Sequence, residues 1–245
     1  MFYTMMLRIN AMWASAGVDR TLDYRSTNDE LTKSEIVGML AAALGRDREE
    51  PIDDLAALRF AVRTDRPGAP FSDAQTVTIF EERKEKKYFF HKEYLAGASF
   101  LVGLESENKE FLESLLEAVR HPHYTLYVGR KNCVPMELPD YPMAAGIREG
   151  RLEETMPYED GACPDARLFG KIQYECLPGE KADAFIMDLP VSFSNKERRY
   201  AKRAVRYDSY GASTDFFGDG DIDIGSPYEE GTDFPGVDTD FYEEA

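Results

Sequence analysis

Residues 31–50 read LTKSEIVGMLAAALGRDREE and carry the clearest secondary-structure signal of the chain. Thr32 and Glu35 stand three positions apart, which is the spacing of a capping box at the start of a helix. The apolar residues that follow share one helical face: Ile36, Val37, Met39, Leu40, Ala43 and Leu44. Gly45 is placed for a left-handed C-terminal cap. The sequence therefore predicts an amphipathic helix that ends at Leu44.

The segments on either side of this helix have the patterns of strands. Phe2–Asn10 mixes β-favouring residues with alternation. Leu58–Arg63 alternates apolar and polar side chains, and the Pro-Gly-Ala-Pro loop at 67–70 ends it. Between the helix and this second strand, Pro51–Leu58 is a candidate for a short helical piece.

The chain then predicts two strands, a helix and a last strand. Thr76–Phe80 and Ala98–Leu104 read as strands on either side of a charged stretch. Asn108–Arg120 is an amphipathic helix stopped by Pro122, and Tyr124–Val128 reads as a strand. With the charged stretch treated as an insertion, the order is strand, helix, strand, strand, helix, strand. That is the split βαβ, or ferredoxin-like, arrangement, which hosts many functions besides RNA recognition.

The expected fold class is α+β, with a ferredoxin-like (RRM-like) core in residues 1–132 and an arm at about 77–93. Residues 133–207 are expected to form a β-rich second lobe that completes the fold. Three strand-like pieces lie in this lobe: 167–176, 183–189 and 199–206. Residues 208–245 form an acidic, aperiodic tail, which we expect to be disordered. The alternative is an acidic mimic that shields an RNA surface or contacts a basic partner.

The formal net charge of −17 is unevenly distributed along the chain. Residues 208–245 hold 12 of the 46 acids and none of the 29 bases, so the first 207 residues carry only −5. A nearly balanced body can present a basic face, and association with a charged partner depends on that local face more than on the total. The overall acidity therefore does not exclude a nucleic-acid partner.

Composition excludes several classes of protein. No apolar run approaches the roughly 18 residues of a membrane span, and the first residues lack the basic region of a signal peptide. Cys133, Cys163 and Cys176 form no C-x-x-C pair, which argues against a disulfide framework and a zinc site. We expect a cytoplasmic protein with no membrane partner, no metal and no cofactor.

Lys33 and Ser34 form the first of three candidate RNA-binding clusters. They stand at the start of the first predicted helix, where free backbone amides and the helix dipole favour a phosphate. A capped helix with a solvated lysine explains the same residues equally well.

The second cluster follows the strand predicted at Tyr124–Val128. Gly129 ends this strand and presents Arg130, Lys131 and Asn132 at its tip. Two cations there can neutralise phosphates, and Tyr124 can stack on a splayed base. A simple basic turn is the alternative interpretation.

The third cluster lies in residues 195–206, which hold six Lys or Arg in twelve positions. Basic residues interleaved with Tyr200 suit a nucleic-acid backbone, and Arg199 and Arg203 share one face of the expected strand. The charged stretch at 83–92 also has many cations, but neighbouring glutamates nearly cancel them. We interpret that stretch as a solvated hairpin arm.

Catalytic motifs are scarce in the sequence. It has no Walker A loop, no H-E-x-x-H, no G-x-S-x-G and no dinucleotide G-x-G-x-x-G after a strand. We therefore expect no enzyme. The alternative is a metal-independent ribonuclease that uses His123, Tyr124 and Lys131. In such a site a base takes the 2′-hydroxyl proton and a cation stabilises the phosphorane-like charge.

Several segments match one known family in order and at similar spacing. They are LTKSEIVGMLAAALGRDREE (31–50), LRFAVRTDRPG (58–68), KEYLAGASFLVGL (92–104) and RHPHYTLYVGRKNC (120–133). These segments resemble the CRISPR-associated CasD family, the Cas-five-type subunit of type I-E Cascade, over roughly residues 3–206. Leu31 and Glu35 stand where the family usually has proline and glycine, and Gln75 where a histidine is common. The family's tryptophan is present, shifted slightly, as Trp13.

The resemblance implies a RAMP-type ferredoxin-like fold with a thumb-like arm. It implies a non-catalytic scaffold that holds the 5′ handle of the CRISPR RNA and contacts the large and backbone subunits in antiviral defence. Type I-E complexes process RNA with another subunit, whereas the type I-C branch uses its Cas-five protein as the ribonuclease, so the nuclease alternative stays open. By this resemblance, Lys33 and Ser34 lie in the helix-start motif, and Gly129, Arg130 and Lys131 in the loop after a strand.

Overall fold

The structure of the protein is a computed structural model. It describes residues 1–17, 24–81, 84–164, 166 and 170–210. The chain divides into two units, Met1–Gly211 and Ala212–Ala245. The fold described below is that of the first unit, and nearly all of the predicted acidic tail, from residue 211 on, lies outside the described residues.

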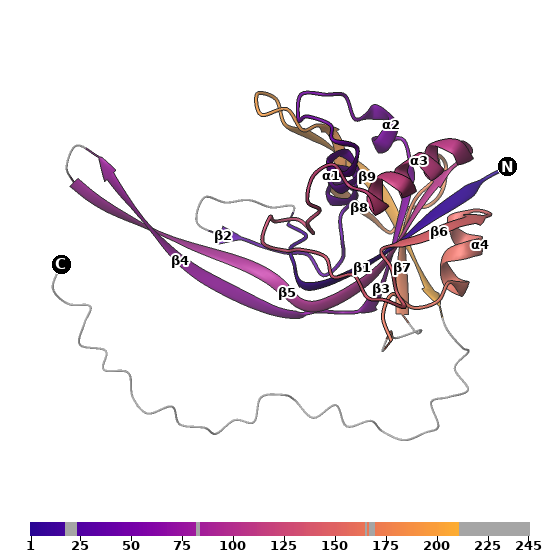
Figure 1. The fold of residues 1–245 in the computed structure, drawn as a ribbon, viewed down its shortest axis with the longest axis horizontal. Helices are drawn as coiled ribbons and strands as arrows, with labels where there is room; N and C mark the ends of the chain where they lie inside the picture. The colour runs from indigo at the N-terminus through magenta and orange to yellow at the C-terminus, as the bar shows by residue number, and fades with distance from the viewer. Residues whose placement is uncertain (18–23, 82–83, 165, 167–169, 211–245) are drawn as a thin grey trace, which may run out of the picture. The chain divides into compact units, whose positions relative to one another are not determined.

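One large sheet runs through the first unit, with the strand order β6-β1-β5-β3-β7-β9-β8 (Figure 1). The strands on this path are β6 (Ala144–Glu149), β1 (Tyr3–Ala14), β5 (Lys84–Ser106), β3 (Arg59–Arg66), β7 (Gly170–Glu175), β9 (Arg199–Tyr210) and β8 (Ala184–Ser192). All neighbours along the path pair antiparallel. Two further strands pair with β5: β4 (Ala69–Glu81) antiparallel and β2 (Tyr24–Arg25) parallel.

The sheet has a hydrophobic core on each face, because successive side chains of a strand point to opposite sides. Met5 packs in a cluster with apolar residues of α1 (Lys33–Leu44) and α3 (Lys109–Arg120). Met6 packs on the other side with Leu152 and Met156. These two residues belong to α4 (Leu152–Thr155) and to the 3₁₀ helix Met156–Tyr158, while a further short helix, α2 (Asp53–Ala56), lies within the predicted helical piece.

The predicted helices are confirmed. Thr32 caps α1, with its hydroxyl accepting the Glu35 amide, and Gly45 ends the helix with a left-handed φ of 77°. Asn108 caps α3 in the same way, with its side chain accepting the Phe111 amide at 3.0 Å. Both helix starts could be read from the sequence because capping depends on residues that are close along the chain.

The strand predicted at Tyr124–Val128 is wrong. This segment crosses the surface of α1 as a loop: the amide of Tyr124 donates to Ala42 O at 3.2 Å, near the end of the helix. Leu126 and Val128 are buried. A loop packed on a helix therefore reproduces the alternation of a half-buried strand. The strand that pairs with β1 at this edge is β6, which the sequence reading did not identify.

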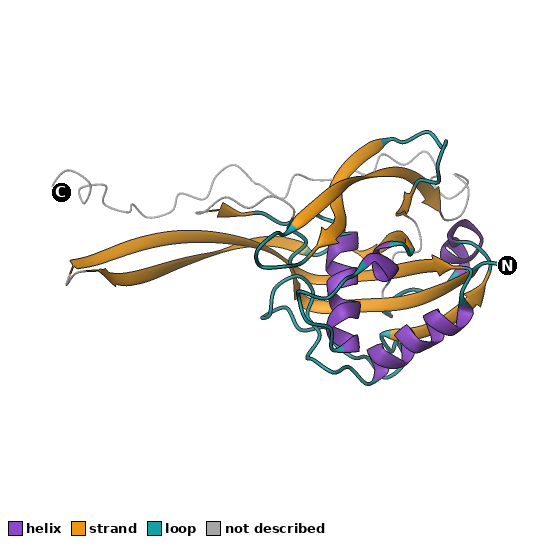
Figure 2. Cartoon of the chain, turned by 90° about the horizontal axis from the view of Figure 1, so that it is seen from above, coloured by secondary structure: helices purple, strands orange, loops and turns teal. Residues whose placement is uncertain are grey.

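β4 and β5 form a long hairpin that projects away from the part of the unit that carries the helices (Figure 2). Their pairing runs from Ala69 opposite Ala96 to Glu81 opposite Lys84. We call the part of this hairpin beyond Phe71 and Tyr94 the arm. The strand predicted at Ala98–Leu104 is thus the inner end of a single strand of 23 residues that also forms the arm.

The three strand-like pieces of the later chain are confirmed as β7, β8 and β9. They continue the main sheet through the pairing of β3 with β7. Among the described residues, no helix is both long and apolar enough to cross a membrane.

Candidate nucleic-acid interface

Lys33 lies inside the protein and not on a surface that a phosphate can reach. Its side chain is 1% exposed, and its Nζ donates to both carboxylate oxygens of Glu175 at 3.0 and 2.8 Å. Its backbone amide donates to Asp188 at 2.9 Å, so a carboxylate of β8 occupies the anion position at the start of α1. Burial lowers the pKa of the Lys33 ammonium, and the Glu175 carboxylate opposes that shift. The phosphate site predicted at Lys33 is therefore already filled from within the chain, and the neighbouring Ser34 hydroxyl bonds to Thr32.

Arg203 is also an internal residue. It is 3% exposed, and two of its nitrogens bond to the carboxylate of Asp188 at 2.9 and 2.7 Å. A further bond of 2.8 Å goes to Gln173. Arg199, by contrast, is exposed at the start of β9 and lies 3.5 Å from Glu197. Of the two cations predicted from β9 to bind RNA, only Arg199 is available to a ligand.

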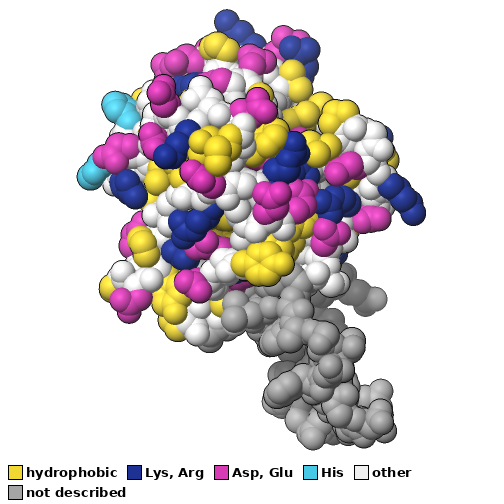
Figure 3. All heavy atoms as spheres, turned by 90° about the vertical axis from the view of Figure 1, so that its right-hand side faces the viewer, with side chains coloured by type: hydrophobic (Ala, Val, Ile, Leu, Met, Phe, Trp, Pro, Cys, Tyr) yellow, Lys and Arg dark blue, Asp and Glu magenta, His cyan; other side chains and the backbone are white. Residues whose placement is uncertain are grey.

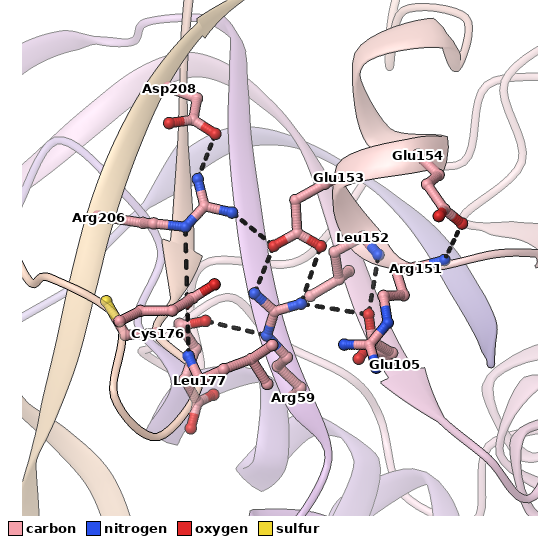
Figure 4. Close-up of polar contacts among 12 residues, drawn as sticks. Arg59, Glu105, Arg151, Leu152, Glu153, Glu154, Cys176, Leu177, Arg206 and Asp208 are labelled. Carbon is pink, nitrogen blue, oxygen red and sulfur yellow. Dashed lines mark hydrogen bonds and ion pairs between the residues drawn. The ribbon is translucent and has the colours of Figure 1, made fainter.

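A chain of ion pairs holds α4 against the sheet (Figure 4). Glu153 on α4 pairs with Arg59 of β3 at 2.5 Å and with Arg206 of β9 at 2.5 Å, and Arg206 also pairs with Asp208. Burial by itself would raise the pKa of Glu153, but hydrogen bonds from Arg59 and the charges of Arg59 and Arg206 lower it to about 2. Arg206, the last cation of the basic run, therefore has a structural partner.

The end of the unit turned away from the arm has mixed charge. In Figure 3, Lys and Arg side chains on this face are interspersed with Asp and Glu. Such a surface gives no uniformly positive region for a nucleic-acid backbone. The loop that follows Gly129 lies at the other end of the unit, where the arm begins.

Position 129 has no room for a side chain, so it requires glycine. Its φ is 84°, and a Cβ placed on it would lie 1.8 Å from the Ser15 carbonyl oxygen and 2.6 Å from a carboxylate oxygen of Glu35. The loop that begins here is therefore pressed against the end of β1 and the start of α1. Burial raises the pKa of Glu35 to about 8, against the hydrogen bonds that its carboxylate accepts from Thr32.

Arg130 fastens this loop to the root of the arm. Its guanidinium donates to the carbonyl of Glu93 at 2.8 Å and to that of Arg25 at 3.0 Å. It also lies over the ring of Tyr94, 4.6 Å from the centroid. The side chain of Asn132 donates to the Tyr94 hydroxyl at 3.2 Å, while Lys131 is exposed.

Tyr94 is the centre of an aromatic group. Its buried ring stacks on Phe71 at 5.2 Å and contacts Trp13 at 6.0 Å, and Trp13 lies 5.6 Å from Phe71. Trp13 remains 42% exposed. These residues and the loop make one surface, the arm-base cluster: Trp13, Phe71, Tyr94, Arg130, Lys131 and Asn132.

The structure does not bring together the three residues of the ribonuclease alternative. His123 lies at the end of α1, where its amide donates to Ala43 and its ring lies against Gly45 and Tyr124. Lys131 follows Gly129, which lies beside Glu35 near the start of the same helix. Seven residues of α-helix separate these places by about 10 Å. In the part of the chain that the structure describes, no group of three or more His, Cys, Asp or Glu could hold a metal ion.

Family comparison matches residues 4–206 to the family described as CRISPR-associated protein (Cas_Cas5). The chain belongs to the Cas5 family. The match contains the whole arm-base cluster and all three clusters predicted from the sequence. A comparison with curated proteins found no match.

Solved structures resemble this Cas5 chain over most of its length. One is a chain described as "CRISPR RNA-guided surveillance complex", with a TM-score of 0.68 and 25% sequence identity over 84% of this chain and 90% of that chain. Another, described as "Crystal structure of Cas protein", has a TM-score of 0.61 and 32% identity, and the match covers 84% of this chain and 94% of that chain.

Sequence reasoning found half of the arm-base cluster of this Cas5 protein. It identified the loop from Gly129 to Asn132 but left the role of Trp13 open and missed Phe71 and Tyr94. These two face each other across the hairpin, and that register is a contact between separate segments. The β-favouring residues on both sides of the charged stretch 81–87, read as the two strands of one hairpin, were the signal that could have found them.

Proposed function

We propose that this Cas5 protein is a non-catalytic RNA-binding scaffold subunit of a type I-E CRISPR surveillance complex, or Cascade. The observation that carries the proposal is its similarity, over 84% of the chain, to a chain of a CRISPR RNA-guided surveillance complex. The CasD-like segments at 31–50 and 120–133 support the type I-E assignment. In this role the protein holds the 5′ handle of the CRISPR RNA and contacts the large and backbone subunits.

The core of this scaffold is ferredoxin-like. Its elements follow the chain order β1, α1, β3, β5, α3, β6, and the four strands lie in the order β6-β1-β5-β3 with antiparallel pairing. Each helix therefore connects two strands that are separated in the sheet by a third. This is the split βαβ pattern.

The RNA contact of the scaffold is the arm-base cluster. Arg130 uses hydrogen bonds to two backbone carbonyls, so its guanidinium is held in place while its charge is not cancelled by a hydrogen-bonded carboxylate among the described residues. Lys131 is exposed beside it. A fixed guanidinium next to an exposed ammonium suits the phosphates of a bent single strand. Arg199 offers a second, separate phosphate contact.

The geometry around His123 supports a role without catalysis. A general base must reach the proton that it removes, and the cation that stabilises the transition state must reach the same phosphate. His123 and Lys131 lie near opposite ends of α1, and the ring of His123 packs on Gly45 and Tyr124. Both observations favour a histidine that closes the end of a helix.

The arm is the surface for assembly with other subunits. Its described residues include large apolar side chains that are 40–74% exposed: Val77, Ile79, Phe80, Tyr88 and Phe89. Val77 pairs with Tyr88 on one face, and Phe89 lies opposite Thr76 on the other. A two-stranded hairpin with apolar groups on both faces gains stability when a partner covers it.

Lys131→Glu tests the RNA contact. We expect the affinity for handle RNA to fall about 5- to 10-fold, because one phosphate contact becomes a repulsion. The affinity is measured by anisotropy of labelled RNA over a range of salt concentrations. Lys181→Glu, the same charge change at an exposed site between β7 and β8, is the matched control and should leave affinity unchanged. Equal loss in the two variants would remove the arm-base cluster from the proposal.

Incubation with repeat RNA tests the absence of catalysis. The purified full chain, without added metal, should leave CRISPR repeat RNA intact. Cleavage that disappears in His123→Ala would overturn the scaffold assignment in favour of the ribonuclease.

A further inference from the structure

We infer that Trp13 is a stacking platform for one unpaired base of a bound single-stranded RNA, at the root of the arm. The inference rests on the proposed RNA-binding function and adds to it a specific ligand group and a specific side chain. Trp13 belongs to β1, close to the end of that strand, and lies opposite Ala96 of β5.

The indole is supported on one side and open on another. Phe71 and Tyr94 contact it at tilted angles of 57° and 47°, and their own rings stack on each other at 17°. This backing fixes the position of the indole, while 42% of Trp13 stays exposed. A large aromatic ring held rigidly at the surface loses little conformational freedom when a base stacks on it.

The Arg130 guanidinium and the Trp13 indole share one neighbour, the ring of Tyr94. Arg130 and Trp13 both contact the ring of Tyr94, at centroid distances of 4.6 and 6.0 Å. A base on Trp13 therefore places its phosphate within reach of the Arg130 guanidinium or the neighbouring Lys131. The combination of an aromatic face with adjacent phosphate-binding cations is what single-stranded RNA sites use.

The chemistry of this surface favours RNA over a protein partner. One indole is a small apolar area compared with the roughly 800 Å² that each partner buries in a stable protein interface. Its ring neighbours are Phe71 and Tyr94, and Tyr94 in turn contacts the cationic Arg130 and the amide of Asn132. The exposed Asn132 can meet a base edge. The class of ligand is therefore an unpaired nucleotide, with stacking that tolerates any base.

Trp13 is the single tryptophan of the chain, so its fluorescence reports on this site alone. The full chain is titrated with a single-stranded RNA of about a dozen nucleotides, a length that fits one binding groove. We expect quenching of the emission that follows the binding curve from anisotropy of the same RNA, labelled. An abasic oligomer of equal length and a fully paired duplex should give no quenching, because neither offers an unstacked base.

Substitution separates stacking from folding. Trp13→Ala should weaken RNA binding about 5- to 150-fold, the value of one stacked base, and Trp13→Phe should restore part of the loss. Met12→Ala is the matched control, since Met12 is the neighbouring residue and is 64% exposed. It should bind as the unmodified chain does. Circular dichroism of all three variants checks that the sheet is intact.

The outcomes distinguish this inference from the proposed function. If labelled RNA binds but the Trp13 emission does not respond and Trp13→Ala binds normally, the inference is overturned and the scaffold function stands. If the full chain binds no RNA at all, the proposed function fails and the inference fails with it. If the emission responds to partner subunits in the absence of RNA and not to RNA, the indole belongs to a protein interface, and the inference is again overturned.

Discussion

Glu35 links the fold to the candidate RNA site at the scale of one residue. It completes the capping box of α1 by accepting the Thr32 amide at 3.1 Å, and its carboxylate lies beneath Gly129. The same side chain thus completes the cap of α1 and contacts the loop that begins at Gly129. Its burial makes the charged form unfavourable, which is why its pKa rises to about 8.

Glu35→Gln should remove a pH dependence of stability. The folded protein keeps a proton on Glu35 between the ordinary pKa of 4.5 and about 8, whereas the unfolded chain loses it. The free energy of unfolding therefore falls as pH rises through this window, by up to about 1.4 kcal/mol per pH unit. Glutamine stays neutral and still fits a capping box. Urea unfolding from pH 5 to 9 should show the variant gaining stability relative to the unmodified chain.

Glu110→Gln is the control for this measurement. Glu110 is an exposed acid in the first turn of α3, so its substitution changes the charge of a helix start without changing a buried group. It should not reproduce the gain. Parallel pH curves for Glu35→Gln and the unmodified chain would contradict the prediction.

Residue-level prediction from sequence succeeds where partners are close along the chain. The pair Thr32 and Glu35 is separated by three positions, and its geometry follows from helical spacing alone. Lys33 stands between them, but its partners Glu175 and Asp188 come more than 140 positions later. Nothing near Lys33 in the sequence indicates that it is buried, so both interpretations of the sequence, a phosphate site and a solvated lysine, placed its side chain at the surface.

At the scale of elements, a helix could be predicted more completely than a strand. The three-residue spacing of caps and the 3.6-residue period mark both ends of α1. The last strand of the core was predicted at Tyr124–Val128, whereas the strand that pairs with β1 at that edge is β6. A strand is defined by its pairing partner, and β6 follows Val128 only after a long irregular segment, so the sequence alone did not reveal the pairing. β5 was read as two pieces because its outer half is charged and faces solvent on both sides, whereas its inner half is an apolar run that is buried on both faces of the sheet.

The arm should contribute to assembly and not to the stability of the chain itself. Phe80 and Phe89 are 74% and 65% exposed and lie on the same face of the hairpin. Replacing both by serine should lower the recovery of the assembled complex on size-exclusion chromatography. The isolated chain should keep its free energy of unfolding within about 0.5 kcal/mol, since neither ring is buried there.

Phe185→Ser is the matched control for the arm. Phe185 is 69% exposed but lies on β8, an edge strand of the main sheet that does not pair with β4 or β5, the strands of the arm. This variant should assemble normally. Equal recovery of the arm variant and the control would show that the exposed rings of the arm do not contact a partner.

At the scale of the whole molecule, ion pairs join parts of the chain that are distant in sequence. Glu153 connects Arg59, which opens β3, to Arg206 in the last described strand. Arg59 in turn pairs with Glu105 at the end of β5. One carboxylate thus fastens α4 across β3 and β9, and the sequence could not predict this because each partner belongs to a separate segment. Arg206 is one of the six cations counted in residues 195–206, and its pairing with Glu153 is one reason why that count overstated the positive charge available to RNA.

Glu153→Gln should lower the free energy of unfolding by roughly 2 kcal/mol at pH 7, since it leaves two partly buried guanidinium groups without a shared partner. The pKa of Glu153 is depressed from 4.5 to about 2 in the folded protein. Its contribution is therefore complete above pH 4.5 and is lost as pH falls toward 2. Urea unfolding at pH 7, 4 and 2.5 should show that the difference in the free energy of unfolding between the variant and the unmodified chain becomes smaller as the pH falls.

Glu149→Gln, at an exposed position of β6, is the control and should show no such difference at pH 7. A deficit of Glu153→Gln that stays constant down to pH 2.5 would mean that the side chain stabilises the sheet by packing and not by its charge.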